Sequence, residues 1–322
     1  TMDPVNQKIL VELQKNSRQS DASLARRIGR SETSVRRRIG RMIETKIINI
    51  TAVTTPWRVG LNASAFIGLQ VELPRLEEIM AALALRPRVH FIAFTTGRFD
   101  IMTWVTFQTA EELGRFLKQD LAAVTGITRF ETMMIIDWRK RDQRILIDEA
   151  PESNAATLNG EPATSHPPAG TPGRLYEIDD RDRSIIRQLQ QNARQSDAMI
   201  SRKLSLSEST VRRRIKRLID EGVITVSAVT NPFEVGFTTV AFIGLQAQLP
   251  MINHICRRLA AMPRVHSVLL TTGHNDIMTW VTLRSPQELT NFMTNDLSSV
   301  PGITGTEILV NLEIKKRELG LL

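Results

Sequence analysis

The feature that most constrains this chain is an internal repeat that covers most of its length. Residues 8–141 align with residues 184–317 at a constant offset of 176 and without an insertion, and 63 of the 134 aligned pairs are identical. The run DIMTWVT, for example, begins at Asp100 and again at Asp276. Solenoid repeats are only about 20–50 residues long, so this one is a duplicated module. With 322 residues in all, each copy is long enough to bury a core of its own.

The segment between the copies, residues 148–175, has the composition of a linker. It contains five Pro and three Gly and almost no large apolar side chain. Such a segment buries too little surface to offset the entropy lost on ordering. As a flexible coil its 28 residues span about 30 Å. The two copies can therefore dock against each other.

Each copy divides into a helical head and a strand-rich part. Over residues 9–47 the apolar positions recur at helical spacing in three short blocks, and from residue 48 the period falls towards two. The elements expected after the head of the first copy are strands at 65–73, 89–95, 101–107 and 128–136 and helices at 76–83 and 113–124. The order βαββαβ after three helices predicts an α+β fold, with two copies of a helix-turn-helix head followed by a ferredoxin-like βαββαβ sandwich domain.

The predicted domains follow from these patterns. They are a first head at 1–50, a first sandwich domain at 51–147, the linker at 148–175, a second head at 176–226 and a second sandwich domain at 227–322.

The remaining composition excludes several classes of protein. A lone cysteine, Cys256, excludes an internal disulfide, and the five histidines have no cysteine partners with which to form a structural zinc site. The first residues lack the basic start and apolar run of a secretory signal. No stretch approaches the roughly 18 uncharged apolar residues of a membrane span. We therefore expect a soluble, cytoplasmic protein without a metal, a cofactor or a membrane partner.

The positive charge of the chain is concentrated in the heads. Residues 8–46 contain eleven Lys and Arg against four Asp and Glu, and residues 184–222 contain nine against four. The two heads together carry a formal charge of +12, which exceeds the +8 of the whole chain. Basic charge gathered on small helical units is typical of a nucleic-acid binder, although arginines on ordinary solvated helix faces would give the same counts.

The third block of the head separates an apolar face from a basic one. At 100° per residue, one stripe holds Val35, Ile39, Met42 and Ile43, and the opposite side holds Thr33, Ser34, Arg37 and Arg41. The tripeptide before this helix has the length of the turn in a helix-turn-helix, and Ser31 is its expected N-cap. In that motif the second helix enters the major groove with its first residues at the base edges.

The predicted DNA contacts come from this helix and from its repeat in the second copy. They are Ser31, Glu32, Thr33, Ser34, Arg36, Arg37, Arg38 and Arg41, and Ser207, Ser209, Thr210, Arg212, Arg213, Arg214, Lys216 and Arg217. Glu32 keeps two interpretations, because it could accept a hydrogen bond from cytosine or simply stabilise the first turn through the helix dipole.

Several motifs in a fixed order resemble one known family. They are DASLARRIGRSETSVRRRIGRM from Asp21, TTPWRVGLNASAFIGLQVE from Thr54, TTGRFDIM from Thr95, IDDRDRSIIRQLQ from Ile178 and PGITGTEILV from Pro301. Together they resemble the leucine-responsive regulatory protein/AsnC family of transcription regulators, twice in tandem, over about residues 8–141 and 178–318. The resemblance implies a DNA-binding head and a sandwich domain that dimerises and binds a small effector, commonly an amino acid.

The resemblance also implies an effector loop. The family's Gly-x-aromatic-Asp turn maps onto Gly97, Arg98, Phe99 and Asp100, and onto Gly273, His274, Asn275 and Asp276, where the aromatic residue is missing. Glycine lets backbone N–H groups approach an anion, and a carboxylate pairs with an ammonium group. The alternative is a simple β-turn, for which Gly and Asp are the usual residues. The equivalent residues His90 and His266, and Trp104 and Trp280, are expected to pack in strands or at an interface.

The favoured function is a sequence-specific DNA-binding transcription regulator, modulated by an amino acid or another small effector at the sandwich-domain interface. Its expected partners are double-stranded DNA, that effector, and other sandwich domains in an intramolecular pseudo-dimer or higher oligomers. Two alternatives stay open. The predicted architecture also resembles that of the sirohaem decarboxylases, but the His-Asn-Tyr and Asn-Leu-Trp motifs of those enzymes are missing here, so no enzyme activity is expected. An architectural protein that compacts DNA with little sequence preference also fits.

Overall fold

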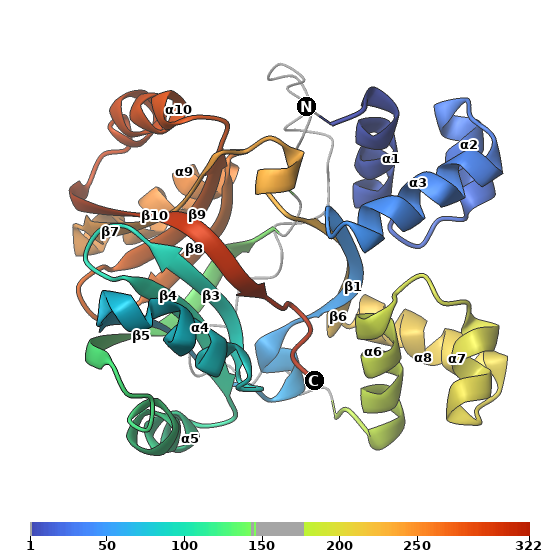
Figure 1. Cartoon of the computed structure of the whole chain (residues 1–322), viewed down its shortest axis with the longest axis horizontal. Coiled ribbons are helices and arrows are strands. Elements are labelled where there is room, and N and C mark those ends of the chain that lie inside the picture. Colours follow the sequence, from blue (N-terminus) through green and yellow to red (C-terminus); the bar gives the residue numbers. More distant parts are fainter. Residues whose placement is uncertain (1, 143–144, 146–176) are drawn as a thin grey trace.

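The computed structural model describes residues 2–142, 145 and 177–322 (Figure 1). The predicted linker at 148–175 lies outside the described residues. Within them the elements follow one another in the same order in both copies, as the repeat predicts. The two heads lie on one side of the molecule and the strands of the two sandwich domains on the other (Figure 1).

Each head consists of three helices. They are α1 (Pro4–Lys15), α2 (Asp21–Ile28) and α3 (Glu32–Glu44) in the first head and α6 (Asp180–Gln191), α7 (Asp197–Leu204) and α8 (Glu208–Asp220) in the second. Each of α2, α3, α7 and α8 begins after a serine whose hydroxyl accepts a hydrogen bond from the backbone N–H three residues later. These caps explain why the breaks between the helical blocks fall at QSD and RSE or LSE.

The strands that leave the heads pair with each other. They are β1 (Ile48–Thr54) and β6 (Ile224–Thr230), and they run antiparallel in a two-stranded sheet. The first helix of each head packs on the strand of the other copy, α1 on β6 and α6 on β1. The apolar residues of both heads and both strands belong to one continuous core. The predicted boundary between residues 50 and 51 falls inside β1.

The sandwich domains have the predicted element order. The first consists of β2 (Ala63–Val71), α4 (Leu76–Ala84), β3 (Val89–Thr95), β4 (Ile101–Phe107), α5 (Ala110–Arg115) and β5 (Ile127–Arg141), and the second of β7 (Thr239–Ala247), α9 (Ile252–Ala261), β8 (Val265–Thr271), β9 (Ile277–Leu283), α10 (Pro286–Asn291) and β10 (Ile303–Arg317). The order β3-β4-β2-β5 is that of a ferredoxin-like sheet, which confirms the predicted α+β fold. The helices of each sandwich cover a separate apolar core on one face of its sheet.

The last strand of each sandwich domain continues into the other copy. Strand β5 pairs with β2 as far as Met134 and with β8 from Ile135 onward. Strand β10 pairs first with β7 and then, from Asn311 onward, with β3. The strands thereby close a barrel in the order β10-β3-β4-β2-β5-β8-β9-β7. Each copy therefore completes the sheet of the other.

Several predicted boundaries are wrong. The strand expected at 65–73 is β2 at Ala63–Val71. The last strand was expected to end at residue 136, but β5 ends at Arg141. Its final residues, DWRKR, lack apolar alternation, so no local pattern marks them as a strand, and their pairing with β8 contains register shifts. The helix expected at 113–124 begins and ends three residues earlier, and only its first part is α-helical: α5 covers Ala110–Arg115, and the chain continues as a π-helical turn over Phe116–Leu121.

Within residues 2–142, 145 and 177–322, no helix has the length and apolar character that a membrane span requires.

Candidate nucleic-acid interface

The turn before the third helix of each head uses left-handed backbone. Gly29 ends α2 with a φ of 71°, and Ser205 takes the same place after α7 with a φ of 54°. Glycine adopts this conformation without steric cost, whereas serine brings a β-carbon too close to the following carbonyl. Ser31 then caps α3, and its hydroxyl accepts from the Ser34 N–H at 3.3 Å. The helix-turn-helix geometry is present in both heads, with strain in the second turn.

The third helices have one packed face and one open face. Val35, Ile39 and Met42 are buried in the first head, as their spacing predicts. Ile43 is 41% exposed, so its predicted packing is wrong, because it lies at the edge of the apolar stripe in the last turn. The exposed or half-exposed residues of the open faces include Thr33, Ser34, Arg37 and Arg41 on α3 and Ser209, Thr210, Arg213 and Arg217 on α8.

Three arginines on the open faces have uncommitted guanidinium groups. Arg37, Arg41 and Arg213 are exposed and form no side-chain hydrogen bond or ion pair with another described residue. Lys216, in contrast, pairs with Asp220 one turn later on α8. An exposed guanidinium without a protein partner can bind a phosphate or a guanine edge at no cost in lost ion pairs.

Arg36 and Arg212 are exposed but engaged. Arg36 Nε lies 3.0 Å from Asp21 Oδ2, and the same guanidinium pairs with Glu32 one turn earlier. The hydrogen bond with Asp21, followed by the charge of Glu32, raises the pKa of Arg36 above its ordinary value. Arg212 forms the equivalent pairs in the second head. Glu32 is thus held by Arg36 as well as by the helix dipole, and its predicted base contact has no separate support.

Arg38 and Arg214 turn back towards the first helix of their own head. Arg38 Nη1 lies 3.1 Å from Asp3 Oδ1. Arg214 Nη1 lies 2.8 Å from both Asp179 and Asp182, and the Asp182 side chain is only 2% exposed. Removing either member of such a buried pair leaves an uncompensated charge. Arg214 therefore helps to hold the second head together, and Arg38 forms a more exposed ion pair at the equivalent place in the first head.

The two heads contact each other through reciprocal ion pairs that the sequence analysis missed. Arg18 Nη2 lies 2.9 Å from Asp197 Oδ1, and Arg194 Nη2 lies 2.7 Å from Asp21 Oδ1. Arg194 also donates to the backbone carbonyl of Gln19 at 2.9 Å. The signal was the run RQSD, which both copies contain at equivalent positions. The repeat of this run marks the same four positions in both copies. It does not reveal that the run of one copy contacts the run of the other, which is the arrangement of an isologous interface.

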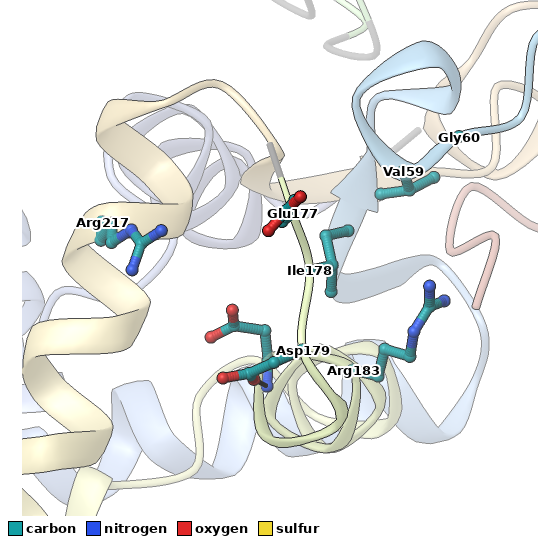
Figure 2. A pocket seen from close by; sticks show the side chains of 8 residues that line it. Val59, Gly60, Glu177, Ile178, Asp179, Arg183 and Arg217 are labelled. Atoms are coloured by element: carbon teal, nitrogen blue, oxygen red, sulfur yellow. Dashed lines mark hydrogen bonds between the residues drawn. The ribbon is translucent and has the colours of Figure 1, made fainter. Parts of the chain in front are cut away.

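A cleft of about 630 Å³ lies beside the second head, and Figure 2 shows the residues that line it. Arg217 projects from α8 on one side, and Glu177 and Asp179 lie across from it (Figure 2). Asp182 and Arg183 complete the charged lining. Because the carboxylates outnumber the guanidinium groups, the lining as a whole does not attract a phosphate backbone.

The predicted effector loops join β3 to β4 and β8 to β9. Asp100 uses its carboxylate to accept the Val71 N–H at 2.8 Å, and Asp276 accepts the Ala247 N–H at the same distance. Gly97 has a φ of 94° and meets the backbone of the other copy's β10, where Ile308 O would lie 3.0 Å from any β-carbon. This is the geometry of the turn alternative.

The remaining residues of these loops lie at the contact between the copies. Arg98 Nε lies 2.9 Å from Glu307 Oε1, and its Nη1 lies 3.0 Å from Glu131 Oε2. Phe99 is buried against Gly68, where a β-carbon would collide with its ring. In the second copy Asn275 takes the place of Phe99 and donates to Glu307 Oε2 at 2.7 Å. His274 stands beside Gln246.

Comparison with known families decides the assignment. The Lrp/AsnC ligand binding domain matches residues 64–145 and 240–321, which is half of the chain. The chain belongs to the Lrp/AsnC family. An AsnC-type helix-turn-helix domain also matches residues 2–43, and a winged helix-turn-helix DNA-binding domain matches residues 178–225. This assignment confirms the resemblance that the sequence motifs carried, and the paired matches confirm the tandem arrangement.

Individual relatives match one copy at a time. An uncharacterized HTH-type transcriptional regulator of Pyrococcus abyssi is 40% identical over 144 residues, which are 44% of this chain and 91% of that protein. The HTH-type transcriptional regulator Ptr1 of Methanocaldococcus jannaschii is 31% identical over 140 residues, which are 43% of this chain and 95% of that protein. Among solved structures, the siroheme decarboxylase NirDL covers 97% of this chain and 92% of its own, with a TM-score of 0.63 and 14% identity. At that identity the likeness shows a shared fold.

Proposed function

We propose that this Lrp/AsnC protein is a sequence-specific transcription regulator in which one chain presents the two heads that a dimer would present. The proposal rests on the family, on relatives named as transcriptional regulators, and on the basic open faces of α3 and α8. The two heads would read an imperfect palindrome with half-sites one or more helical turns, about 34 Å each, apart.

The observation that carries this proposal is the pair of reciprocal contacts between the heads. Arg18 to Asp197 and Arg194 to Asp21 tie the heads to each other. The β1–β6 sheet is joined to the barrel by Arg141 at the end of β5 and Arg317 at the end of β10, which donate hydrogen bonds to the carbonyls of Thr54 and Thr230. Because α3 and α8 are held at one separation, they favour DNA in which the two half-sites have one spacing. A flexible pair of heads would not favour any one spacing. Such fixed spacing argues against an architectural protein without sequence preference.

The DNA contacts we propose are a subset of the predicted residues. Their guanidinium or hydroxyl groups face outward from the third helices, and they are Thr33, Ser34, Arg37, Arg41, Ser209, Thr210 and Arg213. Because the copies differ at Thr33 and Ser209 and at Ser34 and Thr210, we expect the two half-sites to differ in sequence.

We propose further that a small effector modulates DNA binding, and that the protein acts in the cytoplasm and without catalysis. An amino acid at the Gly97–Asp100 and Gly273–Asp276 loops stays a prediction, as does assembly into higher oligomers. An effector at these loops would have to bind without the carboxylates of Asp100 and Asp276, because these already accept hydrogen bonds from backbone N–H groups. The fold shared with a siroheme decarboxylase is the reason to keep enzyme activity as the alternative.

The test is selection of DNA from a random pool by the full chain, followed by titration of the selected site. We expect Arg37→Gln to weaken specific binding about tenfold and to flatten the salt dependence by about one phosphate contact. Arg115→Gln is the matched control, since this arginine lies on α5 with a 58% exposed side chain and far from the heads in the chain. Recovery of a random pool, or equal losses in both variants, would remove the support for sequence-specific recognition by α3.

A further inference from the structure

The residue that follows the left-handed turn differs between the two heads. The first head has Arg30 and the second has Leu206, each directly before the serine that caps the third helix. The backbone is nevertheless the same. The Arg30 N–H donates to the carbonyl of Ala25 at 3.1 Å. The Leu206 N–H donates to the carbonyl of Ser201 at 3.0 Å. The two side chains therefore leave the chain at equivalent places.

These two side chains have opposite surroundings. Leu206 is partly buried and packs against the core that both heads share. Arg30 is exposed, and its guanidinium group forms no hydrogen bond or ion pair with another residue in the described ranges. A position that makes an apolar contact in one head thus presents a positive charge to solvent in the other. It lies at the end of the third helix that enters the groove in a helix-turn-helix.

The turn and third helix of the first head also carry the higher net charge. Residues 29–46 contain six Lys and Arg against two Asp and Glu, whereas the equivalent residues 205–222 contain five against three. The formal charge is therefore +4 in the first head and +2 in the second. The positive potential that attracts a phosphate backbone is stronger over the first.

The partners of the basic residues increase this difference. Arg41 is exposed and unpaired among the described residues, but its counterpart Arg217 projects into the cleft opposite Glu177 and Asp179 (Figure 2). Lys216, which only the second head has, pairs with an aspartate one turn later on α8. Carboxylates thus compete with phosphate for the cations of the second head more than for those of the first.

We propose that the first head binds DNA more strongly than the second, and that Arg30 is a phosphate contact which the second head lacks. Within the described ranges, the first head has three unpaired guanidinium groups, of Arg30, Arg37 and Arg41, and the second has one, of Arg213. Each phosphate contact releases about 0.9 of a counterion, which is a factor of about five in affinity at about 0.15 M salt. Two further contacts therefore give the first head an advantage of about 25-fold. This inference rests on the proposed function and ranks its two heads.

The experiment disables one head at a time in the full chain and measures affinity for the selected DNA site. Arg37→Glu and Arg213→Glu are charge reversals at equivalent positions, and each repels the phosphates under its own head. We expect Arg37→Glu to cost about 25-fold more affinity than Arg213→Glu at about 0.15 M salt. Equal losses would overturn the ranking of the heads.

Exchanging residues between the heads tests Arg30. Arg30→Leu should weaken binding about fivefold and reduce the salt dependence by about one contact, and Leu206→Arg should do the reverse. Lys8→Ser is the matched control, because it removes a charge that the second head also lacks, from an exposed position on α1. The control should keep the salt dependence of the parent. Urea denaturation verifies that each variant is folded in the titration.

Combining the variants locates the contact. Arg30→Leu should cost about fivefold in the Arg213→Glu protein, whose first head still binds, and nothing further in the Arg37→Glu protein, whose first head does not. An equal cost in both backgrounds, or as large a cost for Lys8→Ser, would overturn Arg30 as a contact of the first head. A parent chain that selects no specific DNA would overturn the regulator proposal and this inference with it. Specific binding by two equal heads would overturn this inference alone.

Discussion

At the scale of single residues, the two turns of the heads offer a matched pair of substitutions. Ser205 has a φ of 54° where its counterpart Gly29 has 71°. We expect Ser205→Gly to raise the free energy of unfolding by about 0.5–1 kcal/mol, because it removes the left-handed strain of an L-residue. Gly29→Ser should lower it by a similar amount, although its β-carbon would meet no atom within 4 Å. Urea denaturation of both variants checks the signs, and two changes of the same sign would contradict this account.

His90 is a buried histidine whose titration contributes to stability. Its Nε2 lies 2.7 Å from Thr106 Oγ1, and burial, with a smaller effect of nearby Lys316, Arg88 and Arg141, lowers the pKa of His90 to about 3. The unfolded chain takes up a proton near pH 6.5 that the folded chain refuses, so stability is complete above that pH and falls below it. Between pH 6.5 and 5.5 the loss due to His90 is about 1 kcal/mol.

Comparison with His90→Gln isolates this contribution. Glutamine keeps a polar group near Thr106 but does not titrate, so the stability of the variant should fall about 1 kcal/mol less than that of the parent over this pH interval. His254→Gln, on the partly exposed face of α9, should follow the parent. Parallel pH profiles for all three proteins would show that His90 is not held neutral.

At the scale of elements, the sequence predicts what depends on local periodicity and misses what depends on the other copy. The bounds of β3 and β4 agree with the expected strands, because apolar runs bounded by turns mark them within one copy. The end of β5 was missed because its last residues pair with β8, at a register that no local pattern encodes. The sequence predicts a single α-helix after Thr109, but the helix ends in a π-helical turn. This wider turn leaves the spacing of the apolar residues nearly unchanged, so the sequence pattern does not distinguish it from an α-helix.

The same distinction applies to the candidate site. Helical spacing separated Thr33 and Arg37 from the packed stripe, and both lie on the open face. Spacing placed Arg38 and Arg214 beside that face as well, but their long side chains reach carboxylates at the start of the first helix of each head, which only the packing of the head reveals.

At the scale of the whole molecule, we propose that the contacts between the heads set the spacing between the two half-sites of the DNA. Arg18 and Arg194, with side chains 26% and 16% exposed, hold Asp197 and Asp21 of the opposite head. We expect the double variant Arg18→Gln, Arg194→Gln to lose little stability, about 1 kcal/mol or less for each pair. Its affinity for DNA should instead change little when one or two base pairs are inserted between the half-sites. We expect the same insertions to weaken binding of the parent about tenfold.

Spacing tolerance is the measurement that separates this effect from simple loss of charge. Removing two arginines weakens every complex with DNA through lost counterion release, whatever the spacing. The equivalent pair Arg26→Gln, Arg202→Gln removes the same charge from exposed positions on α2 and α7 and should leave the spacing preference intact. If both double variants and the parent prefer one spacing equally sharply, then the β1–β6 sheet alone fixes the heads, and the reciprocal ion pairs add nothing to DNA recognition.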